Sequence, residues 1–240
     1  MADTPEATAR SLADSVAVSW EAQLGARLLS IALIGSLAHG GFSPRYSDID
    51  MAVVAEGGLA SEELALMRAE AAAQAPAHAA KLSLFWADRG FAVGRFPPLD
   101  RVDYVDHAVP LFARELVPPP RPTRDDIRTY LRGQPFASWA QAANAFAEID
   151  ELGPADHKPF IRALLYPARF VYSWTTGAMG SNDDAVAFLD AHAPPGLDVD
   201  LVVRALRCRR EARDPDSLFA ERAALLRQRD ACSRLIAASG

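Results

Sequence analysis

Residues 34–50, IGSLAHGGFSPRYSDID, decide the fold that the sequence predicts. The apolar run Leu28–Ile34 ends at Gly35 and is typical of a buried strand. The polar and glycine-rich residues that follow suit a short helix and then a loop. A second strand is expected over Asp48–Val54. Side chains alternate along a strand, so its first aspartate and Asp50 are predicted to lie on the same face.

This pattern carries a specific chemistry. Asp48 and Asp50 would repel each other without a cation, and Mg²⁺ is commonly held by one or two carboxylates plus substrate phosphates. Gly35 lets the backbone approach a ligand closely, and Ser36 offers a hydroxyl and an N–H to phosphate oxygens at a helix start. The alternative is a capping serine and a solvated strand face. The order of strand, turn and acidic pair favours a site for Mg²⁺ and a nucleoside triphosphate, with in-line attack on the triphosphate.

The rest of the first 117 residues completes an α/β domain with a small mixed sheet. In chain order we expect a helix over 6–27, a helix over 61–75 with Ser61 as its N-cap, and a strand over 81–87. The segment Gly90–Pro98 suits a short strand or a loop, and Val102–Glu115 suits a strand or a helix equally. The two cysteines, Cys208 and Cys232, are expected to be ordinary helix-packing residues of the second half.

A proline-rich run, Pro118–Pro122, is the clearest boundary, because it cannot continue a helix or a central strand. Beyond it the pattern is helical, with helices expected over 123–132, 137–151, 158–176, 182–192, 198–211 and 215–238. We therefore predict a domain of residues 1–117, a linker of residues 118–122 and an all-α helical bundle of residues 123–240. A cleft between two domains is a common place for a ligand.

Composition limits the partners. The chain has 240 residues and a net charge of −6, which is not the usual footprint of a nucleic-acid binder. It is compatible with a nucleotide held through metal ions and with a cationic second substrate. The first residues do not form the basic and apolar pattern of a signal peptide, and no apolar run is long enough to span a membrane. The expectation is a cytoplasmic protein.

The motif resembles that of a known family, the aminoglycoside (streptomycin/spectinomycin) adenylyltransferases of the DNA polymerase β-like nucleotidyltransferase superfamily. The resemblance rests on Gly35-Ser36, Gly40-Gly41, Pro44 and Ser47-Asp48-Ile49-Asp50, and more weakly on Ala168-Arg169-Phe170-Val171-Tyr172, Thr176-Gly177 and Ser181. It implies the nucleotidyltransferase fold, ATP as substrate, two Mg²⁺ ions, and transfer of AMP to a hydroxyl. By matched position, Ser36 and Ser47 would contact phosphates, Asp48 and Asp50 would hold metal, and Arg169 would reach the triphosphate.

Two positions depart from the family pattern. The superfamily places a third carboxylate on a neighbouring strand, as metal ligand and general base, and here that position is occupied by Ser83. The family's lysine after the matched serine is replaced by Asn182, which weakens phosphate binding. Losing a general base typically costs about 10²–10⁴ in rate. The candidates for a substitute base are Asp88, Asp103, Asp106 and His107, and each is expected to be an exposed polar residue.

Other polar and aromatic residues receive ordinary interpretations. Three tryptophans, Trp86, Trp139 and Trp174, are expected in the core, although a tryptophan ring can also stack on a base or a sugar. The arginine-rich segment from Arg204 to Arg213 is interpreted as a solvated face. The segment Asp156–Lys158 suits helix capping, with recognition of a second substrate as the alternative.

The sequence thus favours an enzyme that transfers AMP from ATP to a small hydroxylated, possibly cationic acceptor. A second hypothesis is a degenerate member that binds nucleotide or another ligand without turnover, as a sensor or partner-binding module. Nucleotidylation of a protein or an RNA is a third, with RNA the least favoured because the chain is acidic.

Overall fold

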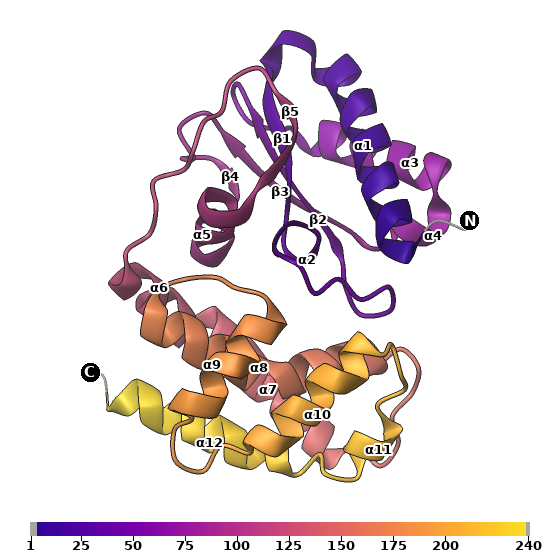
Figure 1. Cartoon of the computed structure of the whole chain (residues 1–240). Helices are drawn as coiled ribbons and strands as arrows, with labels where there is room; N and C mark the ends of the chain where they lie inside the picture. The colour runs from indigo at the N-terminus through magenta and orange to yellow at the C-terminus, as the bar shows by residue number, and fades with distance from the viewer. Residues whose placement is uncertain (1–3, 239–240) are drawn as a thin grey trace. The chain divides into compact units, whose positions relative to one another are not determined.

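The computed structural model describes residues 4–238, which fall into two compact units divided between Pro122 and Thr123 (Figure 1). The first unit is an α/β unit built on one sheet, and the second contains helices only in its described part. This arrangement confirms the predicted fold class, α/β followed by all-α. No helix among residues 4–238 is long and apolar enough to cross a membrane.

The sheet of the first unit has five strands in the order β4-β3-β2-β1-β5. The strands are β1 (Leu28–Ile34), β2 (Ile49–Ala55), β3 (Leu82–Asp88), β4 (Gly94–Arg95) and β5 (Val109–Ala113). Only β2 and β3 pair in parallel, and the other neighbours pair antiparallel, so the sheet is mixed as expected. The parallel pair requires a crossover between β2 and β3. The chain makes it through α3 (Ser61–Gln74) and the short α4 (Pro76–Ala79).

Helices α1 (Pro5–Leu24) and α3 cover one face of the sheet (Figure 1). The apolar face of α1 is buried in one core cluster with alternate residues of the strands. The strand members of that cluster include Ile49, Met51, Val53, Leu84 and, partly buried, Leu82 and Trp86. The even-numbered residues of β3 therefore face the helices. The short helix η1 (Gly25–Arg27) connects α1 to β1.

The opposite face of the sheet packs against α5 (Pro98–His107). Its core cluster contains Ala32, Ala52, Val54 and Ala87 from the strands and Tyr104 from α5. The Tyr104 hydroxyl lies 3.1 Å from the hydroxyl of Ser30 in β1, and burial raises the pKa of the Tyr104 phenol. The ambiguous segment from Val102 to Glu115 thus contains the end of a helix and a strand in succession.

The second unit contains helices α6 (Arg124–Arg132), α7 (Gln134–Glu148), α8 (His157–Thr176), α9 (Asn182–His192), α10 (Val199–Arg210), α11 (Asp216–Phe219) and α12 (Ala224–Ala237). Helix α8 is central, because α6, α7, α9, α10 and α12 all pack against it. Trp139 is buried and donates its indole N–H to the Ala163 carbonyl at 2.9 Å, and Trp174 is also buried. Both tryptophans are core residues, as predicted. Cys208 and Cys232 are both buried.

Two local predictions are wrong. The N-cap of α3 is Ala60, and Ser61 is the first helical residue. The cap interaction is made instead by Glu63, whose carboxylate accepts from the Ala60 N–H at 2.8 Å. The expected single helix over 215–238 is two helices, α11 and α12, separated by turns at residues 220–223. Residues 220–223, Ala-Glu-Arg-Ala, all have good helix propensity, so the sequence pattern alone does not reveal the break.

Candidate functional site

The turn after β1 begins with a glycine that the geometry requires. Gly35 has φ +66°, and its carbonyl accepts from the N–H groups of Ala38 and His39, which starts α2 (Ser36–His39). A Cβ atom at Gly35 would lie 2.4 Å from Oδ2 of Asp50, which is far inside van der Waals contact. Both the backbone angle and the neighbouring carboxylate therefore exclude a side chain here.

Asp50 reaches this turn because β1 and β2 are paired. Ile34 and Asp50 are cross-strand partners at the end of the antiparallel ladder. Asp50 is the second residue of β2, and Asp48 directly precedes the strand. Both aspartates are partly buried. The alternation of the strand places Asp50 on the face of Ala52 and Val54, the face covered by α5.

The loop after α2 folds back and brings two predicted phosphate-binding serines together. The Ser36 hydroxyl donates to the Ser47 hydroxyl at 2.9 Å, and the Ser43 N–H donates to the same oxygen at 2.9 Å. The Ser47 N–H in turn donates to the Ser43 carbonyl. The ammonium of Lys81, just before β3, donates to the Pro44 carbonyl in the same loop. The loop between the turn and the acidic pair thus brings Ser36, Ser43 and Ser47 together in one small polar group near Gly35.

The position expected to carry a third carboxylate lies where the sequence predicts it. Asp50 and Ser83 are in-register partners of the parallel strands β2 and β3, so their side chains share a face. Among residues 4–238, no group of three or more His, Cys, Asp or Glu side chains is arranged to hold a metal ion. The residue of β3 that shares this face with Asp50 is a serine, which brings no carboxylate.

Asp88, the first candidate for a substitute base, belongs to a turn. It ends β3, and its carboxylate accepts from the N–H groups of Ala92 and Val93 at 2.8 and 2.9 Å. These backbone hydrogen bonds, the one from Val93 above all, lower the pKa of the Asp88 carboxyl. In the parallel register Asp88 pairs with Ala55, at the other end of β2 from Asp50.

The expectation of an exposed polar residue is wrong for Asp103. Its side chain is buried, with 2% of the residue exposed, because α5 packs on the sheet face of Asp50. Asp103 Oδ2 accepts the Gly35 N–H at 2.6 Å, and Oδ1 lies 3.9 Å from Nε2 of His39. The His107 ring meets the His39 ring edge-on at 5.6 Å. Asp106, on the same helix, forms an ion pair with Arg121.

No periodic pattern in the sequence indicates that Asp103 is buried. Val102, Asp103 and Tyr104 are three consecutive buried residues, which neither a helical nor a strand periodicity predicts. The position of Asp103 depends on the packing of α5 against β1, and that contact joins segments far apart in the chain.

The motif residues of the second unit lie at helix ends. Gly177 ends α8 in the left-handed conformation, and its N–H donates to the Ser173 carbonyl. The Thr176 hydroxyl donates to the Tyr172 carbonyl at 2.7 Å. Ser181 begins α9 with a capping box, in which its hydroxyl accepts from the Asp184 N–H at 3.0 Å and the Asp184 carboxylate accepts from Ser181.

Arg169 lies in the middle of α8 and is partly buried. Its charge acts on Arg209 of α10, whose pKa is lowered to about 10 by burial and by this neighbouring guanidinium. Only 7% of Arg209 is exposed. The interpretation of this arginine-rich segment as a solvated face is therefore wrong for Arg209, which brings a second guanidinium near Arg169.

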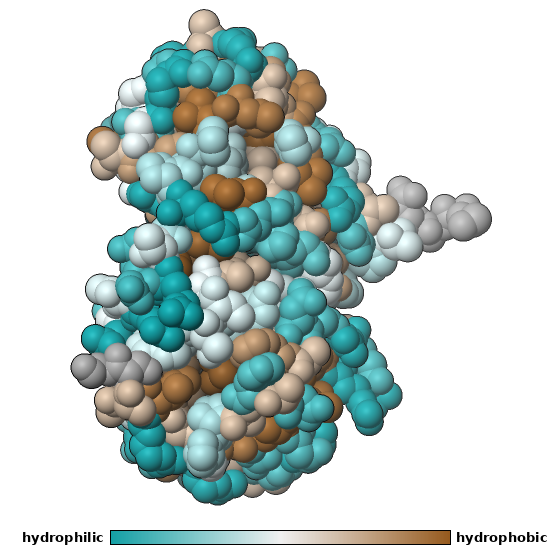
Figure 2. Space-filling view, turned by 60° about the vertical axis from the view of Figure 1, so that its left-hand side comes forward, coloured by the Kyte–Doolittle hydropathy of each residue, from teal (hydrophilic) through white to brown (hydrophobic). Residues whose placement is uncertain are grey.

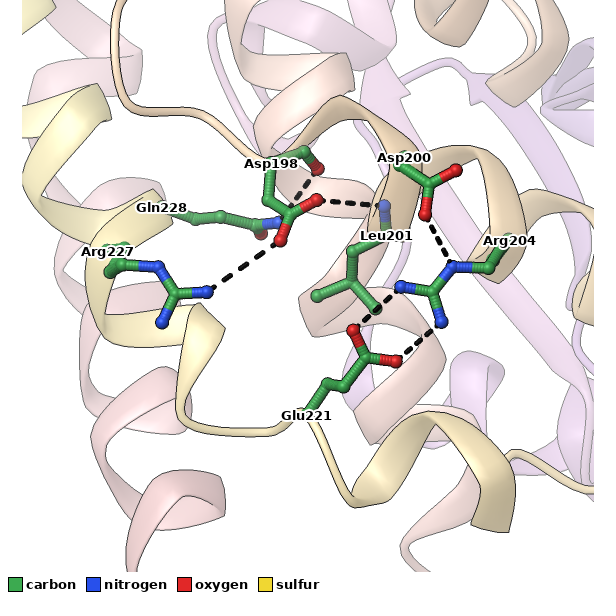
Figure 3. Close-up of polar contacts among 7 residues, drawn as sticks. All are labelled: Asp198, Asp200, Leu201, Arg204, Glu221, Arg227 and Gln228. Carbon is green, nitrogen blue, oxygen red and sulfur yellow. Dashed lines mark hydrogen bonds and ion pairs between the residues drawn. The ribbon is translucent and has the colours of Figure 1, made fainter.

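The other charged residues around α10 form structural ion pairs. Arg204 meets both oxygens of Glu221, at 2.5 and 2.8 Å, and Asp198 caps the helix by accepting from the Leu201 N–H at 3.1 Å (Figure 3). The pairing with Arg204 lowers the pKa of Glu221. Asp183, next to Asn182, pairs with Arg210. These contacts tie α10 to its neighbours.

The start of α8 is also structural. Asp156 occupies the N-cap position without a side-chain capping bond, and its carboxylate accepts from the Gly153 N–H at 3.2 Å. The side chain of His157 is largely buried, and its Nδ1 lies 3.0 Å from a carboxylate oxygen of Asp214. The capping prediction for Asp156 is therefore wrong in its detail, although the helix begins where expected.

The first unit also contains an apolar pocket of about 310 Å³ between β1, α5 and the residues before the linker. Its lining residues include Ala32, Tyr104, Val105, Leu116 and Val117. In the upper part of Figure 2, which is the first unit, apolar atoms form patches among hydrophilic ones. None of the residues that line this pocket belongs to the polar group near Gly35.

A Gly-Ser turn and an acidic pair on the first two strands of a mixed sheet, followed by a helical unit, define a fold of the nucleotidyltransferase type. The structure of the spectinomycin adenyltransferase AAD(9) from Enterococcus faecialis with ATP and spectinomycin has this fold. It matches with a TM-score of 0.65 and 10% sequence identity, over 94% of this chain and 98% of that chain. At this identity the match shows a shared fold.

Other comparisons add little. A toxin–antitoxin structure with AMP-PNP aligns with a TM-score of 0.30 and 18% identity, over 55% of this chain and 92% of that chain, and no conclusion rests on it. No protein-family model matches the sequence, and no curated protein does.

Proposed function

We propose that this chain is a nucleotidyltransferase that transfers AMP from ATP to a hydroxyl group of a small molecule. The observation that carries the proposal is the contact between Asp50 and Gly35. It sets a carboxylate of the acidic pair directly against the turn that begins with Ser36.

The residues present suit a magnesium ion. Asp48 and Asp50 are partly buried oxygen ligands, and Mg²⁺ prefers oxygen and shares its coordination with substrate phosphates. When bound, Mg²⁺ would neutralise the charge that develops on the triphosphate. Ser36 and Ser47, whose hydroxyls are in contact, would hold the phosphates in place. Arg169 of the helical unit is proposed to add positive charge to the triphosphate.

The fold match supports the nucleotide and the acceptor class. The related structure holds ATP and spectinomycin, and a small hydroxylated acceptor is proposed here by that likeness. The net charge of −6 favours a cationic acceptor over an anionic one. A cytoplasmic location is likewise a proposal, which follows from the sequence expectation.

A second candidate is nucleotide binding without turnover. It is favoured by Ser83, which is the in-register partner of Asp50 and has no carboxylate. Without a base near the acceptor, hydroxyl activation would be slower by about 10²–10⁴. Such a protein would act as a sensor or a partner-binding module.

Calorimetric titration with ATP, in the presence and absence of Mg²⁺, tests the binding step. We expect magnesium-dependent binding that is lost in Asp48→Asn/Asp50→Asn. The matched control is Asp14→Asn/Glu62→Gln, which removes two exposed charges from the same unit and should bind like the wild type. Absence of magnesium-dependent ATP binding in the wild type would contradict both candidates.

Turnover separates the two candidates. Pyrophosphate release is measured with ATP and a panel of hydroxylated acceptors, both cationic and neutral. Release that depends on an acceptor supports the transferase. ATP binding with no release across the panel supports the sensor.

A further inference from the structure

The sheet face of Asp50 receives a carboxylate from α5 in place of one from β3. On β3 the in-register partner of Asp50 is Ser83. Helix α5 packs over the same face and contributes Asp103, which is 2% exposed. The Oδ2 atom of Asp103 accepts the Gly35 N–H at 2.6 Å. A hydrogen bond to an ionised carboxylate is roughly twice as strong as a neutral one.

Gly35 is the common neighbour of the two carboxylates. Asp50 approaches the place of the missing Cβ, at 2.4 Å, and Asp103 approaches the backbone nitrogen, at 2.6 Å. The nitrogen and Cβ of one residue are roughly 2.5 Å apart. The two carboxylate oxygens are therefore within about 7.5 Å of each other, an upper limit set by these three distances. A shift of Gly35 would change its contact with each of them.

The buried acid is not explained by packing alone. Its neighbours on α5, Val102 and Tyr104, fill the core with mostly apolar atoms, whereas a buried carboxylate costs free energy unless polar partners compensate. Two of those partners come from the turn itself. One is the Gly35 N–H, and the other is His39, whose Nε2 lies 3.9 Å from Oδ1 and whose side chain is 8% exposed.

Its burial also limits what Asp103 can do. Because only 3% of the Asp103 side chain is exposed, its carboxylate is hardly accessible to an acceptor hydroxyl. Among residues 4–238, no group of three or more His, Cys, Asp or Glu side chains is arranged to hold a metal ion. A direct role as base or as metal ligand does not fit this geometry.

We infer that Asp103 is a positioning residue of the nucleotide site, whose carboxylate holds the Gly35 N–H and so fixes Ser36 and Asp50 in place for the triphosphate. This inference rests on the proposed function, because it assigns Asp103 to that same site. The residue that holds the turn at Gly35 then lies on α5, 68 residues further along the chain.

The test uses the full chain and measures the Kd of ATP with Mg²⁺ by calorimetry. Asp103→Asn keeps an oxygen that can accept the Gly35 N–H but loses the charge, and Asp103→Leu loses both. We expect binding weaker by about fivefold in the first and about fiftyfold in the second. The matched control is Asp106→Asn, on the same helix and paired with Arg121, which should bind like the wild type.

A second measurement reads the hydrogen bond without any nucleotide. In protein labelled with ¹⁵N-glycine, the Gly35 amide proton should resonate downfield in the wild type and in Asp106→Asn. It should move upfield in Asp103→Asn, together with the weaker binding. If Asp103→Leu does not fold, Asp103→Asn alone tests the inference, through the Gly35 amide shift and the Kd of ATP. A merely structural role would lower the melting temperature without moving the Kd of the folded protein.

The outcomes separate this inference from the proposed function. Wild-type protein that binds ATP with Mg²⁺, together with folded Asp103 variants that bind equally well, would overturn the inference and leave the function standing. Tighter binding in Asp103→Asn would also overturn it, since the carboxylate would then repel the phosphates. Wild-type protein that binds no ATP would overturn the proposed function, and the positioning role with it.

Discussion

The two segments that carry the motif, residues 35–50 in the first unit and residues 176–184 in the second, are held by different kinds of contact. In the second, Gly177 and Ser181 end one helix and begin the next, and their hydrogen bonds are those of any helix terminus. In the first, Gly35 is enclosed by the carboxylates of Asp50 and Asp103.

This difference shows where the case for a nucleotide site is strong. The contacts in the second segment would be needed by a helical bundle of any function. The contacts in the first segment set two carboxylates against one turn, an arrangement that an ordinary helix terminus does not need. The first unit therefore carries the more specific support for the proposed site, and Arg169, within a helix, is the residue of the second unit that is proposed to take part.

The largest expected effect is that of Gly35→Ala. The new Cβ would lie 2.4 Å from Asp50 Oδ2, at a residue with φ +66°. We expect a loss of about 2–4 kcal/mol in the free energy of unfolding of the first unit, and loss of ATP binding. Chemical denaturation and calorimetry measure the two effects.

The matched control is Gly57→Ala. Gly57 has φ +71° and no atom within 4 Å of a new Cβ, so it carries the backbone strain without the clash. It should cost about 1–2 kcal/mol and leave ATP binding intact. Equal effects of the two substitutions would show that Asp50 is not pressed against the turn, and the comparison of the two segments would fail.

Ser83→Glu should have the next largest effect, on turnover. The parallel register places residue 83 beside Asp50, so a glutamate there would restore the third carboxylate. We expect a second Mn²⁺ or Mg²⁺ ion to bind and acceptor-dependent pyrophosphate release to rise by about 10²-fold. Ser83→Gln is the neutral control of the same size. If both variants bind metal as the wild type does, residue 83 is not at the metal site.

Arg169→Ala tests whether the second unit takes part. Losing one charged hydrogen bond to a phosphate should weaken ATP binding by about tenfold or more. Arg162→Ala changes an exposed arginine of the same helix and should leave the Kd unchanged. Equal Kd values for wild type and Arg169→Ala would confine the nucleotide site to the first unit.

The smallest effect is expected at a helix start, and on stability alone. The Thr123 hydroxyl accepts from the Asp126 N–H at 3.2 Å, which caps α6. Thr123→Ala should lower the free energy of unfolding of the second unit by about 1 kcal/mol. ATP binding should not change, and a change in Kd would mean that this helix end belongs to the site.

The same cap gives a pH dependence. Hydrogen bonds from Thr123 lower the pKa of Asp126 in the folded protein. A lowered folded pKa stabilises the protein above the unfolded pKa, which is about 3.9, and this contribution disappears as the pH falls through the folded pKa. Thermal melts should therefore show Asp126→Asn below the wild type at pH 7, with a difference that shrinks under acid. A difference that persists at pH 2 would contradict this cause.

The sequence predicts most of the elements around Gly35 because their signals are local. The apolar run before Gly35, the loop, and the alternation of β2 each lie within a few residues, and β1 and α9 have the predicted bounds. The same alternation predicts that Ser83 lies on the sheet face of Asp50. The positions of Asp103 and Arg209 could not be predicted this way. Each is buried by a helix packing against a distant segment, and a charged residue gives no periodic sign of burial.

The hydrogen bond from Gly35 to Asp103 has a consequence for the order of folding. Gly35 directly follows β1, and Asp50 lies in β2, which pairs with β1 and is close to it in sequence, so their contact is a short-range one. Asp103 is 68 residues beyond Gly35 and is reached only after β3 and α5 have been added. Contacts of long sequence separation form late, because the loop between them must close first. During synthesis the turn would therefore exist before its anchor, and a nascent chain that stops short of α5 would carry the motif without the rigidity to use it.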